Sequence, residues 1–134
     1  MSRRILVPLL VALLAMVGLA LVGCGNSSVK TYTEKDTNVT AKVGSQFVIQ
    51  LQSNRTTGYQ WGVSGTLDSA VVKKVSSKYV PGKNAQKQVC AGGVEDWTFE
   101  AAGKGSAKIV MVYMQPFEQQ AAPAWTVTFD VTVD

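Results

Sequence analysis

The sequence predicts an all-β domain, either a sandwich or a barrel of short strands. In several segments every second residue is apolar, which is the period of a strand with one buried face. Glycines, singly or in pairs, separate these segments as turns. No long segment after residue 23 has the apolar spacing of an amphipathic helix. Several short strands with turns between them are typical of an all-β sandwich or barrel.

The first 23 residues are expected to be a targeting signal and not part of the fold. Arg3 and Arg4 precede an almost wholly apolar run, Ile5–Val22, which is followed by Gly23 and Cys24. This arrangement resembles a bacterial lipoprotein signal, in which Cys24 accepts a diacylglycerol and becomes the first residue of the mature chain. A transmembrane helix and an ordinary secretory signal are the alternatives. The small residue directly before the cysteine favours lipidation at Cys24 and an exported protein, anchored to the cell envelope membrane as a lipoprotein.

Residues 24–35 are expected to be a flexible tether that carries the lipidated cysteine. The segment is rich in small polar residues, with Asn26, Ser27 and Ser28 directly after the start. A tether of roughly eleven residues reaches about 36–40 Å when it is fully extended. The folded domain is then predicted to occupy residues 36–134.

Two segments give the clearest strand patterns. Phe47, Ile49 and Leu51 share one face of a strand whose other face is mostly glutamine. From Trp125 to the end of the chain, apolar residues alternate strictly with threonine or aspartate. Both patterns predict amphipathic strands with one buried face.

The remaining strand candidates are less regular. Residues 107–114 are evenly apolar, which predicts a central strand covered on both sides, or mostly so. Residues 97–99 alternate within a shorter run, and residues 71–75 and 78–80 are weaker candidates. The strand-like surroundings of the three tryptophans predict that they lie in the core or partly in it. These tryptophans are Trp61, Trp97 and Trp125.

The composition argues against an enzyme. There is no histidine, which removes Ser-His-Asp and Cys-His catalysis and the commonest metal ligand. The only adjacent carboxylates, Glu95 and Asp96, would point to opposite faces of a strand. We therefore expect no catalytic residues, no metal site and no cofactor.

Charge and cysteine content limit the possible partners. Without Arg3 and Arg4, the chain keeps 11 of its 13 basic residues against 9 acidic ones. The lysines are scattered, so a nucleic-acid partner is not expected. If Cys24 is lipidated, Cys90 has no disulfide partner within the chain and is either a buried or a surface thiol.

Three segments are predicted to be exposed loops: residues 54–58, 89–93 and 114–124. Each has a purely structural explanation when it is considered alone. Asparagine and glycine suit the turn in the first, Gly92-Gly93 suits a hairpin or bulge, and Pro116 suits the end of a strand. The aromatic residues Tyr59 and Trp61, which follow the first loop, are expected to root it in the core.

Taken in order, the three loops resemble those of the chagasin-type inhibitors of papain-like cysteine proteases. In that family the first loop reads Asn-Pro-Thr-Thr-Gly-Phe/Tyr-x-Trp, the second contains a Gly-Gly pair, and the third reads Tyr-x-Arg-Pro-Trp. The counterparts in this chain are Asn54–Trp61, Ala91–Gly93 and Tyr113–Glu118. The resemblance extends over residues 36–134.

The resemblance implies an immunoglobulin-like antiparallel β-sandwich with three binding loops at one end. The loops would fill the active-site cleft of a papain-like cysteine protease reversibly, with Thr56 and Thr57 closest to the catalytic cysteine. The protein would act as a monomer without a cofactor. The protease-binding residues that the resemblance implies are Asn54, Arg55, Thr56, Thr57, Gly58, Tyr59, Ala91, Gly92, Gly93, Gln115, Pro116 and Phe117.

Three loop positions depart from the family pattern. Arg55 stands where the family usually has proline, which is expected to loosen the first loop and add a charge. Gln115 replaces an arginine, and Phe117 replaces a tryptophan with a smaller stacking surface. These departures keep an alternative open, in which the chain is an immunoglobulin-like envelope lipoprotein that binds a non-protease partner.

Overall fold

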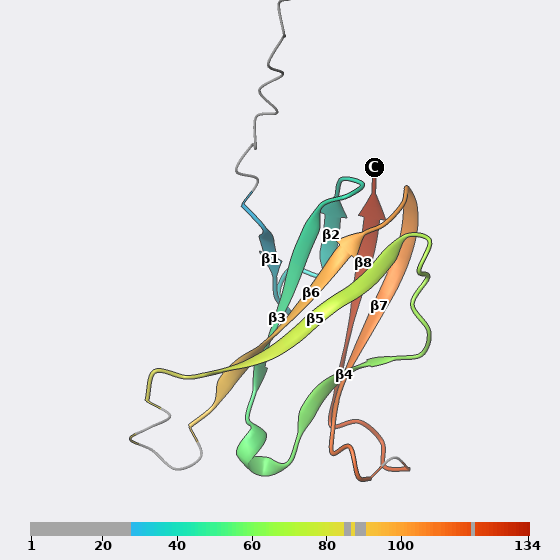
Figure 1. The fold of residues 1–134 in the computed structure, drawn as a ribbon. Coiled ribbons are helices and arrows are strands. Elements are labelled where there is room, and N and C mark those ends of the chain that lie inside the picture. Colours follow the sequence, from blue (N-terminus) through green and yellow to red (C-terminus); the bar gives the residue numbers. More distant parts are fainter. Residues whose placement is uncertain (1–27, 85–86, 88–90, 119) are drawn as a thin grey trace, which may run out of the picture.

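The computed structural model describes residues 28–84, 87, 91–118 and 120–134, and its regular structure consists almost wholly of strands. Two four-stranded sheets pack face to face (Figure 1). The first sheet has the order β1 (Lys30–Tyr32), β3 (Gln46–Ser53), β6 (Gly93–Ala101), β5 (Val72–Pro81). The second has the order β2 (Asn38–Ala41), β8 (Trp125–Val133), β7 (Gly105–Met114), β4 (Gln60–Ser64). The predicted immunoglobulin-like β-sandwich is confirmed.

The central strand pairs are antiparallel, and the two outer strands at one side are parallel to their neighbours. β3 pairs with β6, β6 with β5, β7 with β8 and β4 with β7, all antiparallel. β1 runs parallel to β3, and β2 runs parallel to β8. The chain passes from one sheet to the other between β1 and β2, which the sequence did not indicate.

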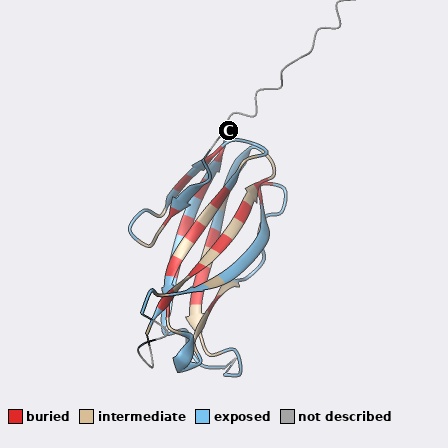
Figure 2. Ribbon diagram, turned by 60° about the vertical axis from the view of Figure 1, so that its left-hand side comes forward, coloured by how far each residue is buried: buried red, intermediate tan, exposed pale blue. Residues whose placement is uncertain are grey.

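The core lies between the inner faces of the two sheets. Phe47, Ile49 and Leu51 of β3 are each at most 1% exposed, as their alternation predicts. Phe47 stacks on Phe99 of β6 with 5.7 Å between ring centroids, and Phe129 of β8 is fully buried. Figure 2 shows this alternation as bands of buried and more exposed residues along the strands. Each large apolar side chain that is fully buried stabilises the fold by about 1.5–3 kcal/mol.

The two weak strand candidates at residues 71–75 and 78–80 belong to one strand, β5. Its pairing with β6 shifts register between Lys74 and Ser76, so the strand contains a bulge. The extra residue, Val75, is exposed. A bulge breaks the period of two, which explains why the strand pattern appears here only as two short and irregular runs.

One tryptophan prediction is wrong. Trp61 and Trp97 are buried, whereas Trp125 is 58% exposed. Trp125 is the first residue of β8 and pairs with Tyr113 at the end of the β7–β8 ladder. The neighbouring strand β2 reaches only as far as Asp130, so it leaves this end of β8 uncovered.

The predicted tether, residues 24–35, includes a strand of the sandwich. Lys30–Tyr32 forms β1, and the Tyr32 side chain is fully buried. The Tyr32 hydroxyl donates to the carbonyl of Thr40 at 2.9 Å and accepts from its amide at 3.2 Å. The packed domain therefore extends at least as far back as Lys30. Cys24 and the predicted targeting signal lie outside the described residues. The part of the chain that is described has no helix suited to crossing a membrane.

Candidate functional site

Three loops lie together at one end of the sandwich, which we call the loop end (Figure 1). The first loop, residues 54–59, joins β3 to β4; the second, residues 82–92, joins β5 to β6; the third, residues 115–124, joins β7 to β8. The strands β3, β5 and β7 all run toward this end. The end of the chain at Asp134 and the start of β1 lie at the opposite end.

The first loop is a tight turn that is closed by its own polar groups. Its centre is a single 3-10 turn, η1 (Arg55–Thr57), capped by Asn54. The Asn54 side-chain oxygen accepts from the Thr56 amide at 3.2 Å and from its hydroxyl at 2.6 Å. The Thr57 hydroxyl donates to the Asn54 carbonyl at 2.6 Å. Gly58 ends the turn in a left-handed conformation, with φ 80°, that favours glycine.

An aromatic stack supports the base of this loop. The ring of Tyr113, on β7, lies 5.3 Å from the ring of Tyr59 and 5.0 Å from that of Trp61. The Tyr113 hydroxyl accepts from the Asn54 amide at 2.9 Å. Trp61 is buried and donates from its indole nitrogen to the carbonyl of Gln52 at 2.8 Å. The predicted rooting of the first loop by Trp61 is confirmed, while Tyr59 is half-buried.

Beneath the loop lies a buried carboxylate, Glu95 on β6, which is 1% exposed. Its Oε1 accepts from the Ser53 hydroxyl at 2.7 Å, the Trp61 amide at 3.3 Å and Arg55 Nε at 3.5 Å. Its Oε2 accepts from the indole nitrogen of Trp97 at 3.3 Å. These partners come from β3, η1, β4 and β6, so one carboxylate links both sheets to the first loop.

Arg55 reaches from the first loop to the strands that carry the second. Besides its ion pair with Glu95, its guanidinium lies 5.2 Å from the centre of the Tyr79 ring. Tyr79 on β5 and Glu95 on β6 are paired residues of the same ladder. Arg55 was expected to leave this loop loose, but its side chain has two partners in the strands beneath the loop, which argue against that expectation.

The third loop approaches the first from the other side. The side-chain amide of Gln115 donates to the Thr57 carbonyl at 3.3 Å. A Cβ placed on Gly58 would lie 3.7 Å from both Gln115 Nε2 and the Phe117 ring. Phe117 is 72% exposed, and Pro116 before it is exposed as well. The third loop thus presents an open aromatic ring beside the tip of the first.

The second loop meets β3 and β6 at its base. Gly92 is exposed, Ala91 is half-buried, and Gly93 is buried at the first position of β6. A Cβ on Gly93 would come within 2.3 Å of the Val80 carbonyl oxygen, so only glycine allows this close pairing. Gly93 is thereby explained by strand packing. Cys90 lies outside the described residues.

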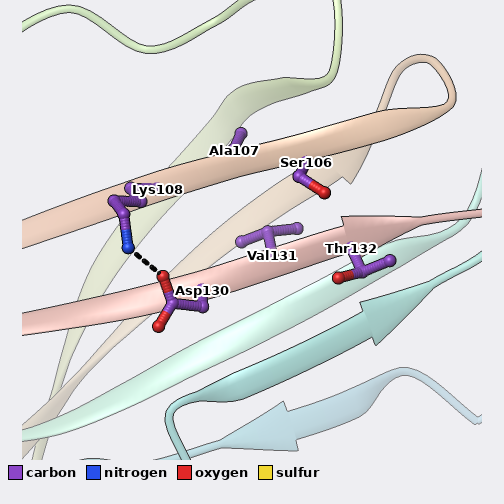
Figure 3. A pocket seen from close by; sticks show the side chains of 6 residues that line it. All are labelled: Ser106, Ala107, Lys108, Asp130, Val131 and Thr132. Atoms are coloured by element: carbon purple, nitrogen blue, oxygen red, sulfur yellow. Dashed lines mark hydrogen bonds and ion pairs between the residues drawn. The ribbon is translucent and has the colours of Figure 1, made fainter.

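Away from the loop end, the described residues form no better candidate for a functional site. A shallow hollow over β7 and β8 lies away from the loop end, and an exposed ion pair between Lys108 and Asp130 crosses it (Figure 3). Exposed ion pairs contribute little energy. Within residues 28–84, 87, 91–118 and 120–134, no group of three or more acidic or cysteine side chains could hold a metal ion.

The protease-binding residues expected from the sequence all lie at the loop end or at its base. The sequence did not show that Glu95, Tyr79 and Tyr113 organise the site, although Tyr113 was recognised as the first residue of the third-loop motif. The signal for Glu95 was present, because it shares a strand face with the apolar Trp97 and Phe99. A charged residue on a buried face implies partners that satisfy it.

Comparison with known protein families gives one match. The family model described as chagasin family peptidase inhibitor I42 matches residues 40–133. The match covers more than half of the chain and all three loops. No curated protein matches this chain.

Solved structures share the fold. The cysteine protease inhibitor EhICP2 from Entamoeba histolytica superposes with a TM-score of 0.68 at 18% identity, over 79% of this chain and 96% of that one. Amebosin gives a TM-score of 0.63 at 29% identity, over 79% and 98% of the two chains. PbICP-C, solved in complex with falcipain-2, gives 0.56 at 21% identity, over 82% and 95%.

Proposed function

This chain belongs to the chagasin family of peptidase inhibitors, and we propose that it inhibits papain-like cysteine proteases by filling their active-site cleft with its three loops. Members of this family are inhibitors and not enzymes, in line with a chain that has no histidine. This class of target is supported by two proteins of similar fold: EhICP2 is a cysteine protease inhibitor, and PbICP-C was solved in complex with falcipain-2.

The observation that carries the proposal is the first loop. Arg55, Thr56, Thr57 and Gly58 are exposed at the tip, although the backbone beneath them is tied by its own hydrogen bonds. Thr56 and Thr57 have small side chains and Gly58 has none, so this backbone can approach the floor of a narrow cleft. A pre-ordered loop loses little entropy on docking, so more of the contact energy appears as affinity.

The same turn explains how the loop would resist cleavage. The Thr57 amide donates to the Asn54 carbonyl at 3.3 Å, and the Gly58 amide donates to the Arg55 carbonyl at 3.1 Å. A peptide in this closed turn differs from an extended one, and opening it would break these bonds. The loop would therefore occupy the cleft without offering a scissile bond in productive geometry, and inhibition would be reversible.

The flanking loops would grip the walls of the cleft. Phe117 is the exposed aromatic of the third loop and would be the anchor on one wall, since buried aromatic residues dominate interface energies. On the other side, Ala91 and Gly92 would present backbone at the edge of the second loop. Asn54 and Tyr59 would support the tip from below.

The direct test is to add the full chain, in detergent, to papain and to follow hydrolysis of a peptide substrate. We expect a concentration-dependent and reversible loss of turnover that a high substrate concentration relieves. A folded chain that leaves papain fully active at micromolar concentration would rule the function out. The exposed first loop gives no support to the alternative, a module for a non-protease partner, for which a buried first loop would have argued.

We also propose that the inhibitor is located at the cell envelope membrane. A lipid on Cys24 would hold the protein at the cell envelope membrane, with the sandwich acting as a monomer outside the lipid. Metabolic labelling with a radioactive fatty acid should mark the wild-type chain and leave Cys24→Ser unlabelled. Equal labelling of both chains would exclude Cys24 as the attachment site.

A further inference from the structure

We propose that Arg55 and Gln115 are positioning residues that brace the first loop from its two sides and so fix the spacing of the three loops. The effect on inhibition rests on the proposed function. The brace itself is a property of the free protein and can be measured without a protease.

The need for a brace follows from the lack of burial in η1. None of its three residues is buried, and single 3-10 turns have strained hydrogen bonds. Packing against the core therefore cannot hold this turn. Its own hydrogen bonds close the turn, and polar contacts from neighbouring elements can hold the closed turn in place.

Arg55 supplies the contact on the side of the second loop. Its Nε lies 3.5 Å from a carboxylate oxygen of Glu95, and its guanidinium lies over the Tyr79 ring. Glu95 is almost completely buried and is held by three other donors, from Ser53, Trp61 and Trp97. The acceptor is thus fixed in place, so the arginine that binds it is fixed too.

Gln115 supplies the contact on the side of the third loop. Its side-chain amide donates to the carbonyl of Thr57, the last residue of η1, at 3.3 Å. Arg55 is the first residue of the same turn. The two ends of η1 are therefore tied to different neighbours: Arg55 to strands β5 and β6, which carry the second loop, and Thr57 to the third loop.

Both braces occur where this chain departs from the family pattern. A proline at position 55 would stiffen the loop through its fixed φ, and the backbone here is ready to accept one. Asn54 is extended, with φ −128° and ψ 91°, so it lies outside the α region that a following proline disfavours. Proline also suits the first position of a helical turn. Arginine and proline are then two ways to order the same turn.

The experiment compares the full-length wild type in detergent with Arg55→Ala, Arg55→Pro and Gln115→Ala. Lys73→Ala is the matched control, because Lys73 is an exposed positive residue on β5 near the opposite end. Amide hydrogen exchange at Thr57 and Gly58 in the free protein reports the order of the turn. The inhibition constant for papain reports its consequence.

In the free protein, Arg55→Ala and Gln115→Ala should accelerate exchange at both amides by roughly fivefold or more, since local opening becomes easier. Arg55→Pro and the Lys73 control should exchange like the wild type. Arg55→Ala should weaken inhibition about tenfold, whereas Arg55→Pro should stay within about threefold of the wild type. Alanine and proline remove the same ion pair, so their difference isolates the order of the loop.

Two results would overturn the proposal. Unchanged exchange in both alanine variants would show that neither residue braces the turn. If Arg55→Pro restored slow exchange and yet inhibited as poorly as Arg55→Ala, Arg55 would act by direct contact with the protease. A wild type that does not inhibit papain would reject the proposed function, and the exchange rates would still decide the brace.

Discussion

Glu95 is the residue on which the loop end most depends. It is a charged group at 1% exposure, and each of its hydrogen-bond partners acts as a donor. An ionised carboxylate only accepts hydrogen bonds, so a carboxylate suits a site in which every neighbouring polar group is a donor. Removing one partner of a buried ion pair lowers stability far more than replacing both partners by well-packed apolar residues.

Replacement of Glu95 by glutamine should lower the free energy of unfolding by about 2–3 kcal/mol. The glutamine NH2 group would face the N–H and O–H donors that the carboxylate now accepts from, and some of them would lose their acceptor. Urea denaturation measures this loss. Asp96→Asn is the control, since Asp96 is the next residue on the other face of β6 and accepts from Gln50 at 2.9 Å. Equal losses in the two variants would contradict a special role for Glu95.

Gly58 offers a second test at a single position. Gly58→Ala should destabilise the fold by about 1 kcal/mol, because alanine is strained at positive φ. It should also weaken papain inhibition by about tenfold or more, because the strain falls on the docking turn.

Gly65 provides the control for that experiment. It has a similar φ of 73°, nothing within 4 Å of an added Cβ, and a position after β4 away from the loops. Gly65→Ala should cost similar stability and leave the inhibition constant unchanged. If both variants inhibit like the wild type, the shape of the first loop does not matter for binding.

At the level of elements, the sequence predicted the strands in which apolar and polar residues alternate over most of the length. β3 and β8 are the clearest cases. β1 was missed because three residues are too short to show a period, and its single buried anchor, Tyr32, reads as one aromatic in a polar segment. β5 was split in two because its bulge interrupts the alternation.

The loops were located by their motifs, whereas the contacts between them could not be predicted. Arg55 and Glu95 are 40 positions apart, and Thr57 and Gln115 are 58 apart. Such pairs follow from the strand order and register, which local patterns do not determine. For this reason Arg55 was expected to loosen the first loop, and its contacts with Glu95 and Tyr79 were not foreseen.

Trp97 is buried and Trp125 is mostly exposed, so their replacements should affect stability differently. Trp97→Ala should cost about 3–5 kcal/mol, because it empties a buried site in β6. Trp125→Ala should cost less than about 1 kcal/mol, since this side chain is mostly exposed. Chemical denaturation of both variants measures the difference, and similar losses would place Trp125 in the core after all.

At the level of the whole molecule, the boundary of the folded unit is testable by truncation. A chain that begins at Lys30 should be as stable as the longer protein. A chain that begins at residue 36 loses β1 and the buried Tyr32, and its free energy of unfolding should fall by about 3 kcal/mol or more. Equal denaturation midpoints for the two chains would show that β1 contributes nothing to the sandwich.

The opposite placement of β1 and the loops determines how the inhibitor would stand on a membrane. Lys30 pairs with Phe47 near the start of β3, and the first loop begins where β3 ends. The eight residues of β3 span about 27 Å, and the link from Cys24 to Lys30 adds at most about 20 Å. With a lipid on Cys24, the loops would face the aqueous space some tens of ångströms above the headgroups. Soluble proteases that approach the surface would meet the loops first, whereas an active site at lipid level would lie below their reach.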